Sequence, residues 1–219
     1  PIPQQQPCSR VAVVPAPSSA AAVPLRIGLF GGTFDPPHIG HATVVGDVAD
    51  VLALDRVLWI PAGDPPHKSR QDLTPAPLRL EMVREAIVDD VRFAVSATEI
   101  RREGPSYTVD TVREIREVYP EAELFLILGA DQFASFQSWR APEEILRMAT
   151  LVVMDRNGVA APDYVPDVPG AERAQFVPVT RVDVSSTQIR NTIAQGGHAV
   201  ADLQPEVAAF IDAEGLYRK

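Results

Sequence analysis

Cysteine is nearly absent from this sequence of 219 residues, in which Cys8 stands alone. A single cysteine excludes an internal disulfide framework and fits a protein of a reducing compartment. A chain of this length buries about 70% or more of the surface that its unfolded form exposes. We therefore expect a stable globular core that needs neither a disulfide nor a structural metal.

Long apolar runs and an excess of positive charge are lacking as well. No apolar stretch approaches the roughly 20 residues that span a bilayer, and the sequence does not open with a charged segment followed by an apolar core. Lys and Arg number 20 against 29 Asp and Glu, for a net charge of −9. Nucleic-acid binding by general phosphate neutralisation needs many basic side chains. The sequence therefore predicts a cytoplasmic protein with no membrane and no nucleic-acid partner, which holds any bound phosphate locally.

Proline, by contrast, is plentiful in two places. Six of the 21 prolines fall within residues 1–24, where their spacing fits neither a helix nor a strand. We expect residues 1–24 to form a mobile extension. Three prolines and a glycine between residues 162 and 170 predict a long loop over residues 156–173. A single domain is predicted for residues 25–219.

From residue 25 onward, short runs rich in Val, Ile and Leu alternate with longer amphipathic stretches, as in βαβ units around a buried parallel sheet. The predicted strands are Arg26–Phe30, Arg56–Ile60, Val91–Val95, Leu124–Leu128, Leu151–Met154 and Gln175–Val179. The predicted helices are Ile39–Leu52, Pro77–Ile87, Thr108–Val118, Pro142–Met148, Ser186–Gln195 and Pro205–Ala213. The fold class is therefore α/β, a doubly wound, Rossmann-like parallel sheet in which ligands bind beyond the carboxyl ends of the strands.

The first predicted strand runs into the motif G-G-T-F-D-P-P-H-I-G-H, which is neither a dinucleotide fingerprint nor a P-loop. Gly31 and Gly32 lack side chains, so their backbone amides can approach an anion closely. His38 and His41 lie three residues apart on the first turn of the following helix, beside amides that attract anions. Each feature alone is more often structural, but their order at a strand-to-helix switch indicates a phosphate site. No third ligand for zinc is evident nearby.

A second polar group stands near the end of the chain, directly before an apolar-periodic stretch. It consists of Ser185, Ser186, Thr187 and, one turn later, Arg190. Helix capping by a serine explains part of this pattern but does not explain the arginine. Hydroxyls, free helix amides and a forked guanidinium can all donate hydrogen bonds to one oxyanion, so a second phosphate contact is the functional interpretation.

Other candidate residues follow the remaining strands. Lys68, in P-P-H-K, comes just beyond the second strand, where phosphate binding and a solvated loop lysine are equally consistent with the sequence. Trp139 lies in a polar loop and can stack on a planar ring or cover the core. Small polar side chains complete the set: Ser106, Tyr107 and Thr108 at a helix start, and Asp131 after the fourth strand.

H-I-G-H after G-G-T-F-D-P resembles the signature of the nucleotidyltransferase superfamily, which includes class I aminoacyl-tRNA synthetases. The pattern S-x-T-x-x-R resembles the second motif of its small adenylyltransferases, in place of the synthetase K-M-S-K-S. The resemblance implies that His38 and His41 contact the ATP phosphates and stabilise charge on the departing pyrophosphate. It also implies that Gly31, Gly32 and Thr33 cradle the nucleotide through their backbone.

With P-P-H-K, S-Y-T-V-D-T, G-A-D and the following tryptophan included, residues 25–219 resemble the bacterial nicotinate-nucleotide adenylyltransferase family. The resemblance implies transfer of the adenylyl group of ATP to nicotinate mononucleotide, with Mg²⁺ as cofactor and with deamido-NAD and pyrophosphate as products. It implies that Asp131 binds a ribose hydroxyl and that Lys68 and Arg190 contact phosphate. The residues implied around the nicotinate ring are Ser106, Tyr107, Thr108 and Trp139.

Three alternatives remain at this stage. A phosphopantetheine adenylyltransferase would share both motifs but not the S-Y-T-V-D-T cluster beside a tryptophan. A non-catalytic nucleotide-binding domain would not need both histidines and Arg190. A synthetase fragment fits poorly, because 219 residues leave little room for a tRNA-reading domain. The sequence leaves open whether the chain forms a homo-oligomer and whether it accepts nicotinamide mononucleotide.

Overall fold

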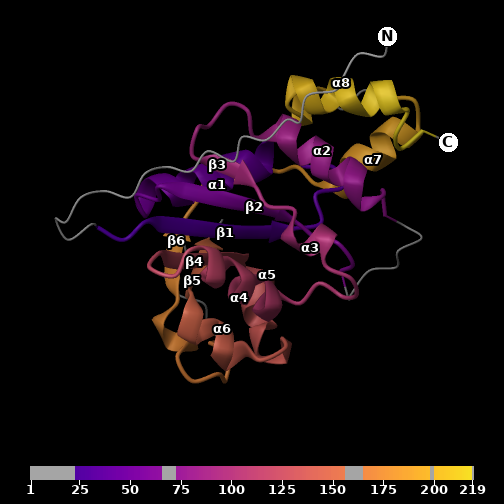
Figure 1. The fold of residues 1–219 in the computed structure, drawn as a ribbon. Helices are drawn as coiled ribbons and strands as arrows, with labels where there is room; N and C mark the ends of the chain where they lie inside the picture. Colours follow the sequence, from indigo (N-terminus) through magenta and orange to yellow (C-terminus); the bar gives the residue numbers. More distant parts are fainter. Residues whose placement is uncertain (1–22, 66–72, 156–164, 198–199, 219) are drawn as a thin grey trace, which may run out of the picture.

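The computed structural model describes residues 23–65, 73–155, 165–197 and 200–218. Six strands in these ranges form one sheet in the order β3-β2-β1-β4-β5-β6, and all neighbouring strands are parallel (Figure 1). The strands are β1 (Arg26–Gly32), β2 (Arg56–Pro61), β3 (Phe93–Val95), β4 (Glu123–Gly129), β5 (Thr150–Asp155) and β6 (Gln175–Pro178). The predicted doubly wound fold class is confirmed. The strand order reverses between β1 and β4, which is where such sheets bind ligands.

The helices connect these strands. The longer ones are α1 (Ile39–Val51), α2 (Ala76–Ala86), α4 (Thr108–Val118), α6 (Pro142–Met148), α7 (Ser186–Ala194) and α8 (Pro205–Glu214). The short ones are α3 (Thr98–Arg101), α5 (Ala130–Ala134) and the 3-10 turns η2 (Phe136–Ser138), η3 (Ala171–Arg173) and η4 (Val200–Asp202). No helix within the described ranges is both long and apolar enough to cross a bilayer.

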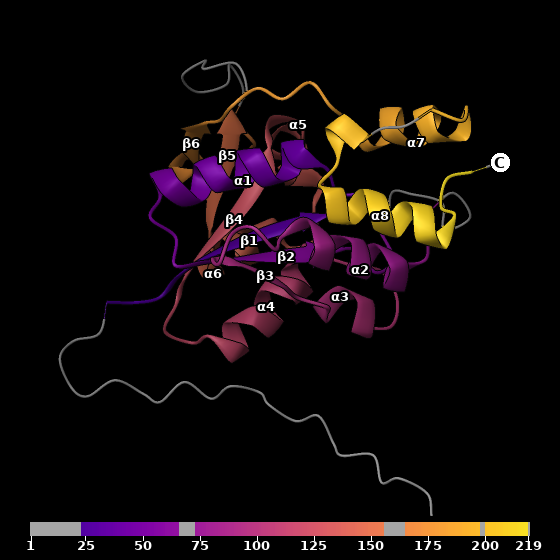
Figure 2. The same cartoon turned by 90° about the horizontal axis from the view of Figure 1, so that it is seen from above.

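Side chains at successive strand positions are buried on opposite faces of the sheet, as strand geometry requires. Ile27 and Leu29 of β1 face a core that α4 and α6 cover, whereas Phe30 faces a second core formed with α1. Figure 2 shows α1 and α4 on opposite sides of the central strands. Both faces of the sheet are therefore covered, which explains why the central strands are apolar throughout.

A third apolar cluster joins α2, α7 and α8 at one end of the molecule (Figures 1 and 2). Met82 and Ala86 of α2 pack there with Ile189 of α7 and with Val207 and Ile211 of α8. This cluster fixes α7 against α2. As a result, a helix from the end of the sequence stands beside elements formed by its first hundred residues.

Some predicted boundaries differ from the structure. The third strand starts at Phe93 rather than at Val91, whose side chain is fully exposed. The carboxylate of Asp90 accepts hydrogen bonds from the amide and the guanidinium of Arg92, which holds a turn before the strand. The predicted extension over residues 1–24 lies outside the described residues up to residue 22, and the predicted loop over 156–173 lies outside them up to residue 164.

Candidate active site

The chain leaves β1 through a turn that a buried aromatic ring stabilises. Phe34 adopts a positive φ of 50°, which is unfavourable for a residue with a side chain. Its ring is 2% exposed and packs against Phe30 and Trp59 at centroid distances of 5.5 and 5.3 Å. A Cβ on Gly32 would come within 2.7 Å of this ring, whereas a Cβ on Gly31 would meet open space. Gly32 therefore makes room for the ring of Phe34, and of the two glycines Gly31 is the one that borders open space.

His38 and His41 stand together at the start of α1. His38 is the residue before the helix and is 7% exposed. The two imidazole rings stack with centroids 3.7 Å apart and planes inclined by 28°. The backbone N–H of His38 donates to Nδ1 of His41 over 3.2 Å. Because Nδ1 is the acceptor, the proton of a neutral His41 ring resides on Nε2, which makes Nε2 the hydrogen-bond donor.

The two sequence motifs meet at the turn before α1. The Ser186 hydroxyl donates to the carbonyl oxygen of Pro36 over 2.8 Å, across 150 positions of sequence. Nη1 of Arg190 donates to the carbonyl oxygen of Asp35 over 2.7 Å. The structure thus brings the start of α7 against the turn that precedes His38, as the two-motif interpretation requires.

The remaining residues of the second motif have local roles that the structure defines. Ser185 caps α7, because its hydroxyl oxygen accepts the backbone N–H of Gln188 over 3.2 Å. Thr187 is exposed in the first turn, and its hydroxyl oxygen accepts a long hydrogen bond of 3.4 Å from Arg190. Gly40 allows the segment before α7 to approach α1, since a Cβ there would lie 2.9 Å from Val184.

Asp35 is a buried link that the sequence did not reveal. Its side chain is 2% exposed, and Oδ1 accepts the hydroxyl of Tyr217 over 2.6 Å. Oδ2 accepts the backbone N–H of Thr74 over 3.2 Å. Burial, together with the nearby Asp35 charge, raises the pKa of Tyr217 well above its usual range, so the tyrosine remains a donor. The carboxylate therefore anchors the turn to the segment after α8.

The loop after β2 is held by Ser106, one of the predicted ring-binding residues. The Ser106 hydroxyl oxygen accepts the backbone N–H groups of Gly63 and Asp64 over 3.1 and 3.2 Å. The Ser106 amide in turn donates to the carbonyl oxygen of Asp64 over 2.9 Å. The hydroxyl oxygen is therefore engaged with this loop. Lys68, which follows the same loop, lies outside the described residues.

Two of the segments predicted to surround the nicotinate ring, residues 106–108 and the loop that carries Trp139, lie next to each other. Tyr107 precedes α4, of which Thr108 is the first residue. The guanidinium of Arg140 lies over the Tyr107 ring, 4.7 Å from its centroid. Trp139, adjacent in sequence, is half-buried and packs against Phe136 at 5.4 Å between centroids. This contact places the start of α4 beside the loop that carries the tryptophan.

Asp131 and Thr33 lie just beyond the carboxyl ends of β4 and β1, the two strands between which the strand order reverses. Asp131 is exposed in the first turn of α5, directly after β4. Thr33 directly follows β1, which pairs with β4 in the sheet. Both residues therefore lie at the carboxyl edge, where the sequence analysis placed the nucleotide.

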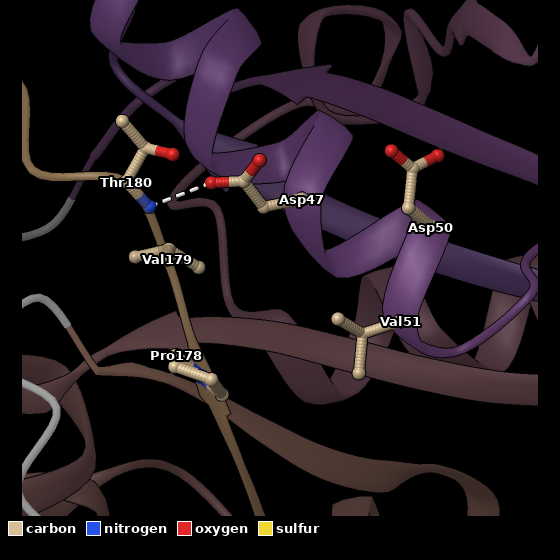
Figure 3. A pocket seen from close by; sticks show the side chains of 6 residues that line it. All are labelled: Asp47, Asp50, Val51, Pro178, Val179 and Thr180. Atoms are coloured by element: carbon tan, nitrogen blue, oxygen red, sulfur yellow. Dashed lines mark hydrogen bonds between the residues drawn. The ribbon is translucent and has the colours of Figure 1, made fainter.

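A cavity of about 330 Å³ lies between α1 and the segment after β6 (Figure 3). Its lining residues are Asp47, Asp50, Val51, Pro178, Val179 and Thr180. Asp47 points toward Thr180 and accepts its backbone N–H over 2.6 Å. None of the predicted site residues that the structure describes lines this cavity, so it is not part of the candidate active site.

Comparison with known proteins identifies the family. The model of the cytidylyltransferase-like family matches residues 29–192, a range that contains both motifs. A curated protein of Shouchella clausii, named "Probable nicotinate-nucleotide adenylyltransferase", is 40% identical, with 88% of this chain and 96% of the relative covered. A protein of the same name from Thermus thermophilus is 43% identical, with 89% and 100% covered. This chain belongs to the nicotinate-nucleotide adenylyltransferase family.

The structural likeness agrees with this family assignment. A crystal structure of a protein from Vibrio parahaemolyticus, named "Putative Nicotinate-nucleotide Adenylyltransferase", superimposes with a TM-score of 0.65 at 25% sequence identity. The match covers 89% of this chain and 96% of the Vibrio chain. The resemblance to the nicotinate-nucleotide adenylyltransferase family, drawn from short motifs, is therefore confirmed over most of the molecule.

One buried cation of this family member escaped the sequence analysis. Arg79 of α2 is 1% exposed, and its hydrogen bonds within the described part of the chain go to backbone carbonyls. A signal was present, because Arg79 occupies the same apolar helix face as Met82, Val83 and Ala86. An arginine in such a stripe needs buried partners, and here these partners belong to the loops of the candidate site.

Proposed function

We propose that this chain transfers the adenylyl group of ATP to nicotinate mononucleotide and releases deamido-NAD and pyrophosphate. The junction of the two motifs carries the proposal: Ser186 and Arg190 are bonded to the turn that leads into the histidine pair. The names of relatives 40% and 43% identical to this chain support the choice of acceptor.

For this reaction the protein mainly has to position its two substrates. The nucleophile is a phosphate monoester oxygen, and the second pKa of such a group is about 6, so it is largely dianionic at neutral pH. It attacks the α-phosphorus of ATP, a new P–O bond forms, and the bond to pyrophosphate breaks. No general base or covalent intermediate is needed. The protein has to hold two anions in line and stabilise the charge that passes to pyrophosphate.

The donors for that charge come from both motifs. Nε2 of His41 donates to a phosphate oxygen, since Nδ1 is occupied by the backbone N–H of His38. His38 stacks on this ring at the amino end of α1, where the helix dipole favours an anion. Arg190 and Lys68 supply further positive charge. The backbone at Gly31, where a Cβ would meet open space, lets the nucleotide approach closely.

Mg²⁺ is the proposed cofactor, and the donor set fits a cation carried by substrate. Among the described residues, no three His, Cys, Asp or Glu side chains gather as metal ligands. Asp35 already accepts hydrogen bonds from Tyr217 and Thr74. Mg²⁺ typically keeps several waters and binds substrate phosphates together with one or two carboxylates. When bound to the triphosphate, it would neutralise charge on the phosphate oxygens.

The acceptor lies on the side of α4 in this proposal. Tyr107, Thr108 and Trp139 surround the pyridine ring, and the contact of Arg140 with Tyr107 supports this grouping. Ser106 supports the pocket through the loop after β2, with its hydroxyl oxygen held by two amides. Asp131 binds a ribose hydroxyl of the ATP-derived nucleoside. ATP and nicotinate mononucleotide are thus the small-molecule partners.

One assay tests the proposal. The purified chain is incubated with ATP and Mg²⁺ plus nicotinate mononucleotide, nicotinamide mononucleotide or phosphopantetheine, and released pyrophosphate is measured. We expect the fastest release with nicotinate mononucleotide and formation of deamido-NAD. Release with phosphopantetheine alone would replace the proposed acceptor, and no release with any acceptor would refute transferase activity.

A further inference from the structure

Arg79, the fourth residue of α2, makes an unusual set of contacts for a helical arginine. Nε donates to the carbonyl oxygen of Thr74 over 2.9 Å, and Nη1 donates to that of Thr33 over 2.7 Å. Nη2 donates to the carbonyl oxygen of Ala62 over 2.6 Å and, more weakly, to that of Gly63 over 3.4 Å. One guanidinium therefore binds three separate segments of backbone.

Two of these segments carry the proposed site. Thr33 belongs to the β1 loop, residues 33–38, which leads from β1 to the histidines of α1. Ala62 and Gly63 belong to the β2 loop, residues 62–65, which leads from β2 toward P-P-H-K. The buried side chain of Arg79 thus connects these two loops through hydrogen bonds to both.

The β2 loop in turn contacts the residues that are proposed to bind the acceptor, nicotinate mononucleotide. The amides of Gly63 and Asp64 are bound to the hydroxyl oxygen of Ser106, which directly precedes Tyr107 and Thr108. A Cβ on Gly63 would lie 2.2 Å from the carbonyl oxygen of Glu99, so this loop also packs closely on α3. A displacement of the β2 loop would therefore move the start of α4 relative to the histidines.

The charge of Arg79 is balanced within the same region. Burial lowers the pKa of the Arg79 guanidinium, and the nearby charge of Asp35 is the largest influence that opposes this effect. An arginine nevertheless stays protonated in proteins. A lysine would keep the charge, but its ammonium is compact and cannot match the forked geometry that reaches several carbonyls at once.

We propose that Arg79 is a positioning residue for adenylyl transfer, which fixes the β1 loop and the β2 loop at the separation that aligns the acceptor phosphate with the α-phosphorus of ATP. This inference rests on the proposed function. A merely structural arginine would lower the melting temperature on replacement and leave turnover by the folded protein unchanged. A positioning arginine also controls kcat, because misplacement by about 1 Å can cost about 100-fold in rate.

The test compares Arg79→Lys and Arg79→Met with a control on the same helix, Arg84→Met. Arg84 is about half exposed and pairs with Glu81, so its loss leaves both loops untouched. Steady-state kcat and KM for ATP and nicotinate mononucleotide are measured well below the melting temperature of each variant. For Arg79→Lys we expect kcat to fall about 10-fold or more, with smaller changes in both KM values, and for Arg84→Met no change.

A second readout does not depend on turnover. Hydrogen exchange at the amides of Gly63 and Asp64 should be faster in Arg79→Lys than in the wild type or in Arg84→Met, because the β2 loop loses its anchor. A folded Arg79→Lys variant with wild-type kcat, or with unchanged exchange in this loop, would overturn the inference. If the wild type transfers adenylyl to none of the acceptors, the proposed function fails, and exchange alone decides whether Arg79 positions the loop.

Discussion

At the scale of single residues, His41 is distinguished by how its ring is held. Its Nδ1 is fixed by a backbone N–H, its face stacks on His38, and the ring of Phe34 approaches it at 5.2 Å between centroids. A donor that is oriented before substrate binds does not have to reorganise during the reaction. Preorganised donors of this kind contribute most of the electrostatic stabilisation in many enzymes.

His41→Ala should therefore lower kcat by about 100-fold or more, which is the usual cost of one lost transition-state donor. The fold should persist, since His41 is only partly buried. Pyrophosphate release measures kcat, and circular dichroism with thermal melting checks the fold. A folded His41→Ala variant with near-normal turnover would remove His41 from its proposed role.

Glu99 is a second residue whose environment has a measurable consequence. It is 9% exposed, and its carboxylate accepts the hydroxyl of Thr111 over 2.8 Å. Burial raises the pKa of the Glu99 carboxyl in the folded protein, and the hydrogen bonds only partly oppose this. Between the unfolded and the folded pKa of Glu99, the folded state therefore retains a proton that the unfolded chain has lost. As the pH rises above the unfolded pKa of about 4.3, the free energy of unfolding should fall.

Glu99→Gln removes this titration. The free energy of unfolding of the variant relative to the wild type should increase as the pH rises from about 4 through the raised folded-state pKa of Glu99, and then level off. Urea denaturation at a series of pH values measures the difference. Glu114→Gln is the matched control, since Glu114 lies near Glu99 and pairs with Arg102, but its side chain is 43% exposed. A constant difference for Glu99→Gln would contradict the assignment.

At the scale of elements, the segment after α8 contacts the turn before α1, which lies far from it in the sequence. Tyr217 donates to Asp35 from 182 positions away, while α8 packs on α2 through an apolar cluster. The same turn is bonded to α7 through Arg190 and Ser186. Two late parts of the sequence, α7 and the segment after α8, therefore stabilise one turn near its beginning.

Tyr217→Phe tests this arrangement. The variant leaves a buried carboxylate without one of its donors, which typically costs about 1–3 kcal/mol. We expect a loss of that size in the free energy of unfolding, measured by urea denaturation. Arg218→Gln is the control, because its partner Asp212 and the arginine are both more than half exposed, and exposed pairs contribute about 0–1 kcal/mol. Equal effects of the two substitutions would exclude a special role for Tyr217.

Helices with a periodic apolar pattern were predictable from the sequence. Very short helices, and contacts between residues far apart in the sequence, were not. α1 and α4 lie within one residue of their predicted ranges because apolar positions recur along them, and the start of α6 was marked by Pro142 in its first turn. α3 and α5 have four and five residues, too few to display a period. The link from Tyr217 to Asp35 and the carbonyl contacts of Arg79 leave no local pattern, because both depend on which segments the fold brings together.

At the scale of the whole molecule, the first element of the described fold is β1, which begins at Arg26. The carbonyl oxygen of Leu25, just before β1, accepts the backbone N–H of Glu123, and every predicted site residue comes later in the sequence. The preceding Val23 is 86% exposed. We therefore propose that residues 25–219 form a single domain.

A chain that starts at residue 23 should therefore fold and work like the full sequence. We expect the same melting temperature and the same kcat/KM for both substrates, within about twofold. Calorimetry and the pyrophosphate assay compare the two proteins directly. A large loss of either quantity on removal of residues 1–22 would show that this stretch contributes to the domain or to its reaction.

The bonds from Ser186, Arg190 and Tyr217 to the turn before α1 also have a consequence for synthesis on the ribosome. Domains emerge with their N-terminal part first, so the histidines leave the exit tunnel long before the residues that fasten their turn. A nascent chain that has not yet reached Ser186 holds the histidine pair without any of these late anchors. The turn before α1 can therefore reach its fully anchored form only after translation has passed Tyr217.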